Sequence, residues 1–271
     1  MSSGSEQDVS LSPAVNEVGV SVLDRGVAIV EIRRPPNNFF DTALIEQIAA
    51  VFDEFDSRTD ARAIVLAAAG KHFCAGADFA GESDAAEVSA DEGARTLYAA
   101  AARLFANQLP VVAAMQGAAI GGGLGLAMVA DFRVASPESR FAANFARLGL
   151  HHGFGLSVTL PRTLGQQRAA ELLMTGRRIG GCEAERVGLV DKLVDEDSIR
   201  STAINLAQEI AAAAPLAVRS IRKTLRGDLA EQIVHATEHE RCEQAWLRAT
   251  QDFAEGVAAS SQRREPVFEA R

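Results

Sequence analysis

The sequence predicts an α/β protein that ends in a purely helical region. Short apolar runs, typical of buried strands, alternate with helix-like patterns over residues 27–135. This alternation indicates a sheet whose strands are joined by crossover helices. After about residue 195 only helical patterns follow. We therefore expect a disordered polar tail over 1–14, an α/β core over 15–195 and a C-terminal helical region over 196–271.

The core begins with a strand and a clearly marked helix. Val27–Arg33 is an apolar run typical of a buried strand, and Asp41 then predicts an N-cap, because its side chain can accept a hydrogen bond from the first helical turn. Six apolar residues of this helix fall on one face: Leu44, Ile45, Ile48, Val51, Phe52 and Phe55. Ala63–Ala68 is a continuous apolar run, which indicates a strand covered on both faces.

Helices and strands then alternate to the end of the core. The patterns predict a helix over Thr96–Leu109, a strand over Pro110–Met115, a helix over Gly121–Ala130 and a strand over Phe132–Ala135. Three helical stretches are expected in the last part of the chain: Ile199–Ala214, Pro215–Leu225 and Leu229–Phe253. We expect this helical part to pack on the core or on another subunit.

Composition and charge exclude several classes of protein. The net charge is −9, whereas nucleic-acid binders normally present a basic surface, so we expect no nucleic-acid partner. The longest apolar-leaning run, Val111–Ala130, contains Gln116 and five glycines, which makes a membrane span improbable. The first 14 residues show no secretory pattern. Three widely separated cysteines argue against a disulfide framework and favour the cytoplasm.

Two glycine-rich segments carry most of the functional information. Lys71–Phe79 (KHFCAGADF) follows one predicted strand, and Gly117–Leu126 (GAAIGGGLGL) follows another. Glycines at the start of a helix let a ligand approach the backbone and leave free amide groups pointing outward. Two such amides that converge on one oxygen form an oxyanion hole, in which each donor typically contributes about 10²–10³ in rate.

Two nucleotide-binding motifs are rival interpretations of the second segment. A dinucleotide fingerprint would use Gly121 and Gly123, but its third glycine would fall on Leu126. A Walker phosphate-binding loop needs a GK[ST] sequence, which does not follow either. The paired glycine-rich turns therefore favour an oxyanion hole over a phosphate cradle.

The two segments, read with their strands, resemble a known family. AIVLAAAGKHFCAGADF and LPVVAAMQGAAIGGGLGLAMVADFRVAS are similar to the crotonase superfamily, the enoyl-CoA hydratase/isomerase family. The resemblance continues through TLPRTLG, ELLMTGRRIGGCEAERVGLVDKLV and APLAVRSIRKTL, and it covers roughly residues 18–264. It implies a core of repeated ββα units, a C-terminal helical region used in trimer formation, and in some members pairing of trimers into hexamers.

The resemblance also implies which residues hold the substrate, an acyl-coenzyme A thioester. The family's oxyanion amides fall on Ala77 and Gly122, which would polarise the thioester carbonyl and stabilise an enolate-like intermediate. Five positions match the family's coenzyme-binding pattern: Pro36, Asn37, Ala75, Asp78 and Arg263. Coenzyme A would enter as part of the substrate, with no permanently bound cofactor and no metal. Asp131 also matches the family pattern, and we interpret it as structural.

The sequence departs from the family where a hydratase carries its two catalytic glutamates. These positions hold Gly125 and Phe145, and a further acid of some dienoyl-CoA isomerases would fall near Gly153. General acid–base groups typically contribute about 10²–10⁴ each, so ordinary hydration should be severely impaired. His151 and His152, in the loop GLHHGFG, are the alternative proton-transfer candidates, because imidazole titrates near neutrality.

These observations predict an acyl-CoA-processing enzyme whose reaction can differ from hydration. Isomerisation, hydrolysis, retro-Claisen cleavage and decarboxylation all remain open. An alternative is a non-catalytic acyl-CoA-binding protein that has lost its acid–base pair. A structural trimer is a third interpretation, although a scaffold has no need for two aimed amides. His235 and His239 have the i, i+4 spacing of a zinc pair, but without HExxH or a third ligand we expect a solvated helix face.

Overall fold

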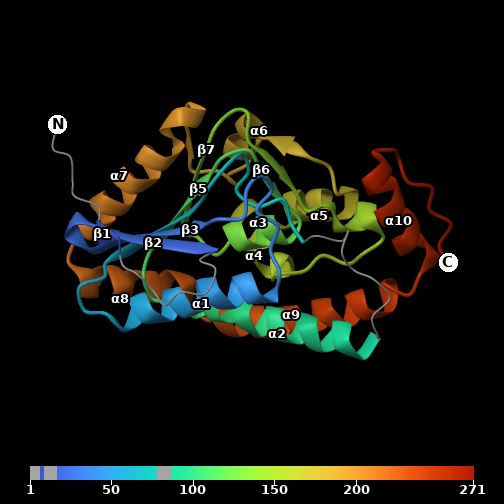
Figure 1. The fold of residues 1–271 in the computed structure, drawn as a ribbon, viewed down its shortest axis with the longest axis horizontal. Coiled ribbons are helices and arrows are strands. Elements are labelled where there is room, and N and C mark those ends of the chain that lie inside the picture. Colours follow the sequence, from blue (N-terminus) through green and yellow to red (C-terminus); the bar gives the residue numbers. More distant parts are fainter. Residues whose placement is uncertain (1–6, 9–16, 78–86) are drawn as a thin grey trace.

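The computed structural model describes residues 7–8, 17–77 and 87–271, and it has the mixed α/β fold with C-terminal helices that the sequence predicts (Figure 1). Its main sheet has seven strands in the order β1-β2-β3-β4-β5-β7-β10. These strands are β1 Gln7–Asp8, β2 Val18–Leu23, β3 Val27–Ile32, β4 Ala63–Ala68, β5 Val111–Met115, β7 Phe132–Ala135 and β10 Lys192–Leu193. Within this sheet β2 pairs antiparallel with both β1 and β3. The pairs β3–β4, β4–β5, β5–β7 and β7–β10 are parallel.

β4 shows why the sheet is covered on both faces. Alternate side chains of a strand point to opposite faces, and the buried side chains of β4 divide between two apolar clusters accordingly. Ile64 and Leu66 pack with helix α1 (Thr42–Ser57) in one cluster, and Ala63 and Val65 pack with helix α7 (Ile199–Ala211) in the other. The predicted strand covered on both faces is thus confirmed.

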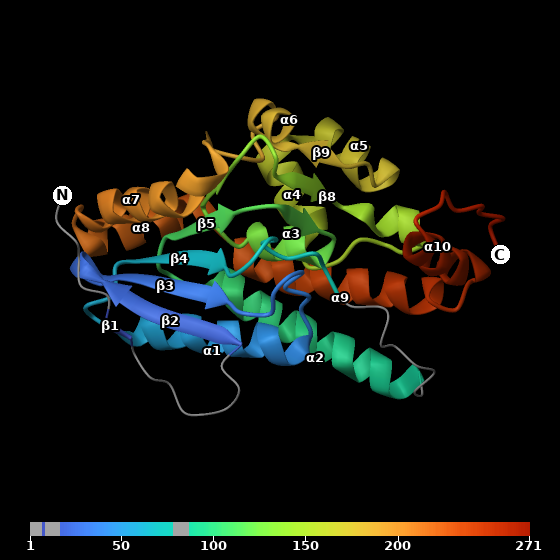
Figure 2. The ribbon, with the colours of Figure 1, turned by 45° about the horizontal axis from the view of Figure 1, so that its top comes forward.

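A small second sheet carries the glycine-rich turn. It consists of β6 (Ala118–Ile120), β8 (Arg140–Ala142) and β9 (Ile179–Gly180), with β6 parallel to β8 and β8 antiparallel to β9. The short helix α3 (Gly122–Ala127) begins two residues after β6 and is completely buried. Helix α3 therefore lies inside the molecule, and its first turn starts at the edge of this sheet (Figure 2).

The remaining helices cover the two sheets. They are α2 Glu87–Ala106, α4 Leu156–Leu164, α5 Gln166–Thr175, α6 Gly181–Arg186, α7 Ile199–Ala211, α8 Pro215–Arg226, α9 Leu229–Leu247 and α10 Gln251–Gln262. Helices α1, α2 and α9 pack side by side beneath the main sheet, and α7 lies on its other face (Figures 1 and 2). Helix α10 lies at the end of the molecule opposite α7 and α8 (Figure 2).

The structure confirms the predicted start of one helix and divides another predicted helix in two. Helix α1 has its N-cap at Asp41, whose carboxylate accepts a hydrogen bond from Leu44 N at 2.9 Å, as predicted. The single helical stretch predicted over Leu229–Phe253 is wrong, because Thr250 caps a new helix by accepting from Phe253 N at 3.1 Å. Of the predicted tail 1–14, only residues 7–8 lie within the described part, where they pair with β2.

Candidate active site

Asn38 fixes the turn between β3 and α1 against the first glycine-rich segment. Its side chain is fully buried. Its amide nitrogen donates to Ala69 O at 2.7 Å and to His72 O at 2.6 Å, while its oxygen accepts from Arg34 N at 2.8 Å. One buried amide therefore joins the turn to the segment that carries CAGAD.

The same turn brings together three of the five predicted coenzyme-binding residues. Ala75 N donates to Asn37 O at 2.9 Å, with Pro36 next to Asn37 in the turn. Asp78 lies outside the described residues. Arg263 is not part of this group: it is exposed, and it ends α10 in a left-handed conformation at the far end of the molecule (Figure 2).

The two glycine-rich segments lie against each other. Cys74 N donates to Ala118 O at 3.0 Å, and Ile120 N donates to Cys74 O at 3.0 Å, so the two chains pair as in a parallel sheet. A Cβ atom on Gly123 would lie 2.2 Å from Cys74 O, so the start of α3 can approach this closely only with glycine. Burial raises the pKa of the Cys74 thiol to about 12, which leaves it a protonated packing group.

This pairing leaves two backbone amides available at the junction. Gly121 has a φ of 57°, a conformation that favours glycine, and it turns the chain so that Gly122 opens α3. Gly76, directly before Ala77, also has a positive φ, of 101°. Neither Ala77 N nor Gly122 N donates a hydrogen bond to another described part of the chain. Both amides thus lack an acceptor among the described residues, and their role as oxyanion donors stays a prediction.

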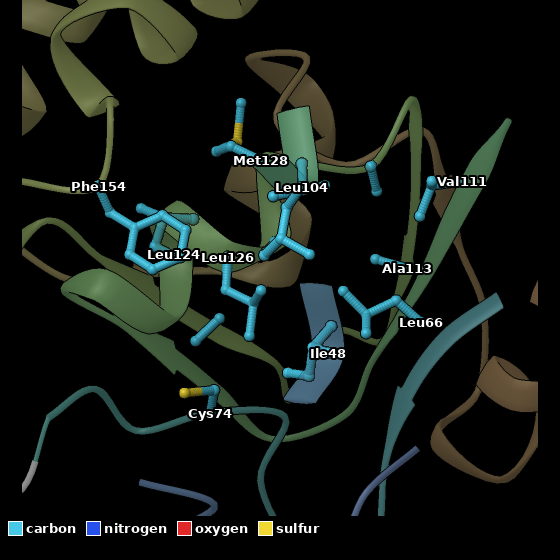
Figure 3. Close-up of a cluster of buried hydrophobic side chains, with 14 of the residues drawn as sticks. Ile48, Leu66, Cys74, Leu104, Val111, Ala113, Leu124, Leu126, Met128 and Phe154 are labelled. Atoms are coloured by element: carbon cyan, nitrogen blue, oxygen red, sulfur yellow. The ribbon is translucent and has the colours of Figure 1, made fainter. Parts of the chain in front are cut away.

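Aromatic side chains cover the glycine face of α3. A Cβ atom on Gly122 would lie 2.4 Å from the Phe40 ring, and one on Gly125 would lie 2.5 Å from Phe154 Cβ. The rings of Phe40 and Phe154 meet edge to face, with centroids 5.7 Å apart. Figure 3 shows Phe154 entering this buried cluster from the loop before α4. The surroundings of α3 on this side are therefore apolar.

Aromatic rings also pack around Gly125 and Phe145, the two positions to which the sequence resemblance assigns the catalytic glutamates of a hydratase. Gly125 faces Phe154, and the Phe145 ring reaches to within 3.7 Å of where a Cβ on Gly121 would stand. A Cβ on Gly153 would lie 2.2 Å from the Tyr98 hydroxyl oxygen. A larger side chain at Gly125 or Gly153 would require the neighbouring rings to move.

His151 and His152 belong to the loop before α4, and their rings lie on the side of this loop that faces α9. Their rings stack with centroids 4.0 Å apart, and the ring of His239 on α9 meets His151 edge on at 5.8 Å. His151 Nδ1 lies 2.8 Å from His152 O, whereas His152 Nε2 is buried without a hydrogen-bond partner. Burial, with smaller contributions from His151 and His239, lowers the pKa of His152 to about 4. His152 is therefore uncharged near neutral pH.

Two residues of α9, Gln244 and Glu240, hold the same loop, and neither was predicted from the sequence. Gln244 on α9 donates to His151 O at 2.9 Å and accepts from the Tyr98 hydroxyl at 3.0 Å. The fully buried Glu240 accepts from Gly155 N at 2.8 Å, and also from Ser157, the second residue of α4. Burial raises the pKa of Glu240, and the hydrogen bonds from Ser157 and Gly155 oppose this rise.

Other sequence expectations can be located on the structure. Asp131 accepts from Val111 N at 2.9 Å and pairs with Arg222 and Arg226 of α8, which gives it a structural role as predicted.

The described residues contain no group of three or more His, Cys, Asp or Glu side chains placed to bind a metal. In the same part of the chain, no helix is long and apolar enough to cross a membrane.

Comparison with known proteins identifies the class to which this fold and site belong. A family model described as enoyl-CoA hydratase/isomerase matches residues 23–271. The chain is 32% identical to a probable enoyl-CoA hydratase of Mycobacterium tuberculosis, over 92% of this chain and 96% of the relative. It is also 32% identical to the carnitinyl-CoA dehydratase of Escherichia coli K12, over 92% of this chain and 98% of that enzyme.

A solved structure gives the same result. The enoyl-CoA hydratase/isomerase of Pseudoalteromonas atlantica superposes with a TM-score of 0.82 at 28% sequence identity, over 93% of this chain and 100% of that one. The protein belongs to the enoyl-CoA hydratase/isomerase (crotonase) family, and it is a probable enzyme acting in acyl-CoA metabolism.

Proposed function

We propose that this enzyme binds acyl-CoA thioesters and holds the thioester oxygen with the backbone amides of Ala77 and Gly122. The observation that carries the proposal is the contact between the two glycine-rich segments, at which both amides lack an acceptor in the described chain. Free donors fixed in advance are what stabilise a developing oxyanion. The neighbouring group of Pro36, Asn37 and Ala75 supports a coenzyme site beside this hole.

We further propose that the reaction is not glutamate-assisted hydration. Gly125 and Phe145 stand where the two hydratase glutamates would lie, and both are packed against aromatic or glycine neighbours. The reactions that remain share an enolate or oxyanion on the thioester carbonyl: isomerisation, hydrolysis, retro-Claisen cleavage and decarboxylation. Each of them can use the oxyanion hole without the missing acids.

His151 and His152 remain the proposed proton-transfer residues, with different properties. His152 is uncharged near neutral pH and can only accept a proton there, because its pKa lies at about 4. His151 stacks on His152 and faces His239, so both rings lie on the α9 side of the loop. A proton transfer by either histidine therefore requires its ring to turn from α9 toward α3. Alanine substitution of both histidines should abolish turnover but leave acyl-CoA binding.

Self-association is proposed from the orientation of α8. This helix turns cationic side chains inward, where Arg222 and Arg226 pair with Asp131. On another side of the helix, Ile221 and Leu225 lie one turn apart and are 59% and 72% exposed. Exposed apolar residues grouped in this way mark contact surfaces. We propose a homotrimer, or a hexamer of two trimers, in which α8 lies at a subunit contact.

The α8 proposal is tested by the double substitution Ile221→Glu and Leu225→Glu. Two buried charges at a contact should convert the assembly to monomers in sedimentation experiments. Lys223→Glu, a change at an exposed residue on the opposite side of the same helix, is the control. If the double variant sediments like the unmodified protein, α8 is not at the contact.

The function itself is tested with two thioesters. Calorimetry should show that butanoyl-CoA binds more tightly than free coenzyme A. Hydration of crotonyl-CoA, followed by the loss of its conjugated absorbance, should be at least about 10²-fold slower than in a family member with both glutamates. If no acyl-CoA binds, the proposed function is wrong, and rapid hydration would contradict the proposal about the reaction.

A further inference from the structure

Phe154 has an unusual backbone conformation for its size. Its φ is 60°, in the left-handed region that bulky residues rarely adopt. Its side chain is only 1% exposed and belongs to the main core cluster. A conformation of this kind persists only where the surroundings impose it, and such positions gather at functional sites.

Side chains of α9 hold the loop on both sides of Phe154. Before it, Gln244 donates to His151 O at 2.9 Å. After it, the carboxylate of Glu240 accepts from Gly155 N at 2.8 Å and from Ser157 N at 3.1 Å. Glu240 thus provides the cap of α4 that the glycine at its N-terminus cannot provide, since it has no side chain. The left-handed Phe154 is fixed by buried partners far away in the sequence.

The fixed ring closes one side of the proposed thioester site. Gly122 and Gly125 lie one turn apart on the same face of α3, which separates them by about 4.5 Å along the helix axis. The Phe40 ring covers the first glycine and Phe154 the second, and the two rings meet edge to face. The two rings fill the space beside both glycines, so an acyl chain whose thioester is held at the amide of Gly122 has no room on this side beyond a few carbon atoms.

We propose that Phe154 and Phe40 are the specificity-determining residues of this enzyme and restrict it to short, wholly apolar acyl groups. The inference rests on the proposed function, because it takes the thioester oxygen to lie at Gly122 N. The restriction on length follows from the ring that stands one helical turn beyond that amide. The restriction on polarity follows from the lining, since neither ring offers a hydrogen-bond partner to a hydroxyl or carboxylate on the acyl group.

The test compares butanoyl-CoA with octanoyl-CoA by calorimetry. The unmodified enzyme should bind butanoyl-CoA about tenfold or more tightly than octanoyl-CoA, because the longer chain meets Phe154. Phe154→Ala should remove or reverse this preference by tightening octanoyl-CoA binding. Phe105→Ala, which truncates an equally buried phenylalanine of α2 away from the glycine-rich turns, should keep the preference. If Phe154→Ala does not fold, Phe154→Leu and Phe40→Leu provide milder openings of the same wall.

The outcomes separate this inference from the proposed function. Butanoyl-CoA binding with equal affinity for octanoyl-CoA in the unmodified enzyme would overturn the specificity role alone. An unchanged preference in folded Phe154→Ala or Phe154→Leu and in Phe40→Leu would do the same. Failure of both thioesters to bind any better than free coenzyme A would instead contradict the proposed function. A longer acyl preference in the Phe154 variants, with Phe105→Ala unchanged, supports the proposal.

Discussion

Asp131 and Glu240 both connect the C-terminal helices to the α/β core, but their partners are opposite in kind. Asp131 pairs with two arginines of α8 at 2.7 and 2.9 Å, so its charge is compensated. Glu240 on α9 is fully buried, and its hydrogen-bond partners among the described residues are uncharged groups of Gly155 and Ser157. Burial raises the pKa of Glu240, although these hydrogen bonds, and to a smaller extent the nearby His151, oppose the rise.

The difference separates an anchor from a positioning group. The ion pairs of Asp131 hold α8 on the core, and stabilising the fold is a sufficient role for them. A buried carboxylate without a cation is costly, and such groups concentrate near functional sites. Glu240 holds the loop that carries the left-handed Phe154, so its cost accompanies the fixed geometry of the proposed acyl site. Removal of Asp131 should therefore change stability alone, whereas removal of Glu240 should also change selectivity.

Asp131→Ala should have the largest effect on stability. It leaves the buried Arg222 and the half-buried Arg226 without their carboxylate, which should lower the free energy of unfolding by about 3–5 kcal/mol in urea titrations. Asp60→Ala removes an exposed pair with Arg58 and should cost no more than about 1 kcal/mol. Equal losses in the two variants would show that the buried pair is not the anchor we describe.

His152 should make stability depend on pH. Its pKa is about 4 in the folded protein and 6.5 as an ordinary histidine, so the unfolded chain binds the extra proton more readily. The stability contributed by the neutral ring is complete above about pH 6.5 and is lost as the pH falls toward 4, by up to about 3 kcal/mol. His152→Gln should show a flatter dependence in this interval. Identical pH profiles for the two proteins would contradict this account of His152.

Glu240→Gln should have a smaller effect on stability and a distinct effect on selectivity. An amide offers one oxygen where the carboxylate offers two, so a donor at Gly155 or Ser157 loses its partner, at about 1–3 kcal/mol. Because the folded pKa of Glu240 is raised, the stability of the unmodified protein should fall as the pH rises above about 4.5, and the variant should lack this component.

Acyl-CoA binding by Glu240→Gln also distinguishes the role of Glu240 from that of Asp131. Loosening of the loop should weaken the preference for butanoyl-CoA over octanoyl-CoA in Glu240→Gln, whereas folded Asp131→Ala should keep it. Glu231→Gln, at an exposed position of the same helix, is the matched control for calorimetry. If both carboxylate variants keep the full preference, Glu240 is a structural residue like Asp131.

Local signals in the sequence predicted much of the fold. The cap at Asp41 and the apolar period of α1 depend only on neighbouring residues, and the structure has both. The break between α9 and α10 also has a local signal, the capping side chain of Thr250, which the helical periodicity of the surrounding residues obscured. The short strands β6, β8 and β9 were not predicted, because two or three residues give too little pattern.

The site was predictable only where backbone determines it. The glycine-rich segments indicated tight turns after two strands, because glycine is what such turns require. The assignment of Ala77 and Gly122 as oxyanion donors came from the family resemblance and stays a prediction. The ring of Phe154 and the carboxylate of Glu240 could not be anticipated, since their partners come from segments far apart in the chain. The orientation of the two histidines toward α9 depends on the same tertiary contacts.

The central claim is that Gly122 N polarises a thioester carbonyl, and infrared difference spectroscopy of bound crotonyl-CoA, isotope-labelled at the thioester carbon, tests it most directly. Gly122→Pro removes the amide hydrogen, and because a side chain there would meet the Phe40 ring, it is made together with Phe40→Ala. The carbonyl stretching frequency should fall on binding to the unmodified enzyme and to Phe40→Ala, and this shift should be largely lost in the double variant. An equal shift in the double variant, or no shift in the unmodified enzyme, would contradict the claim.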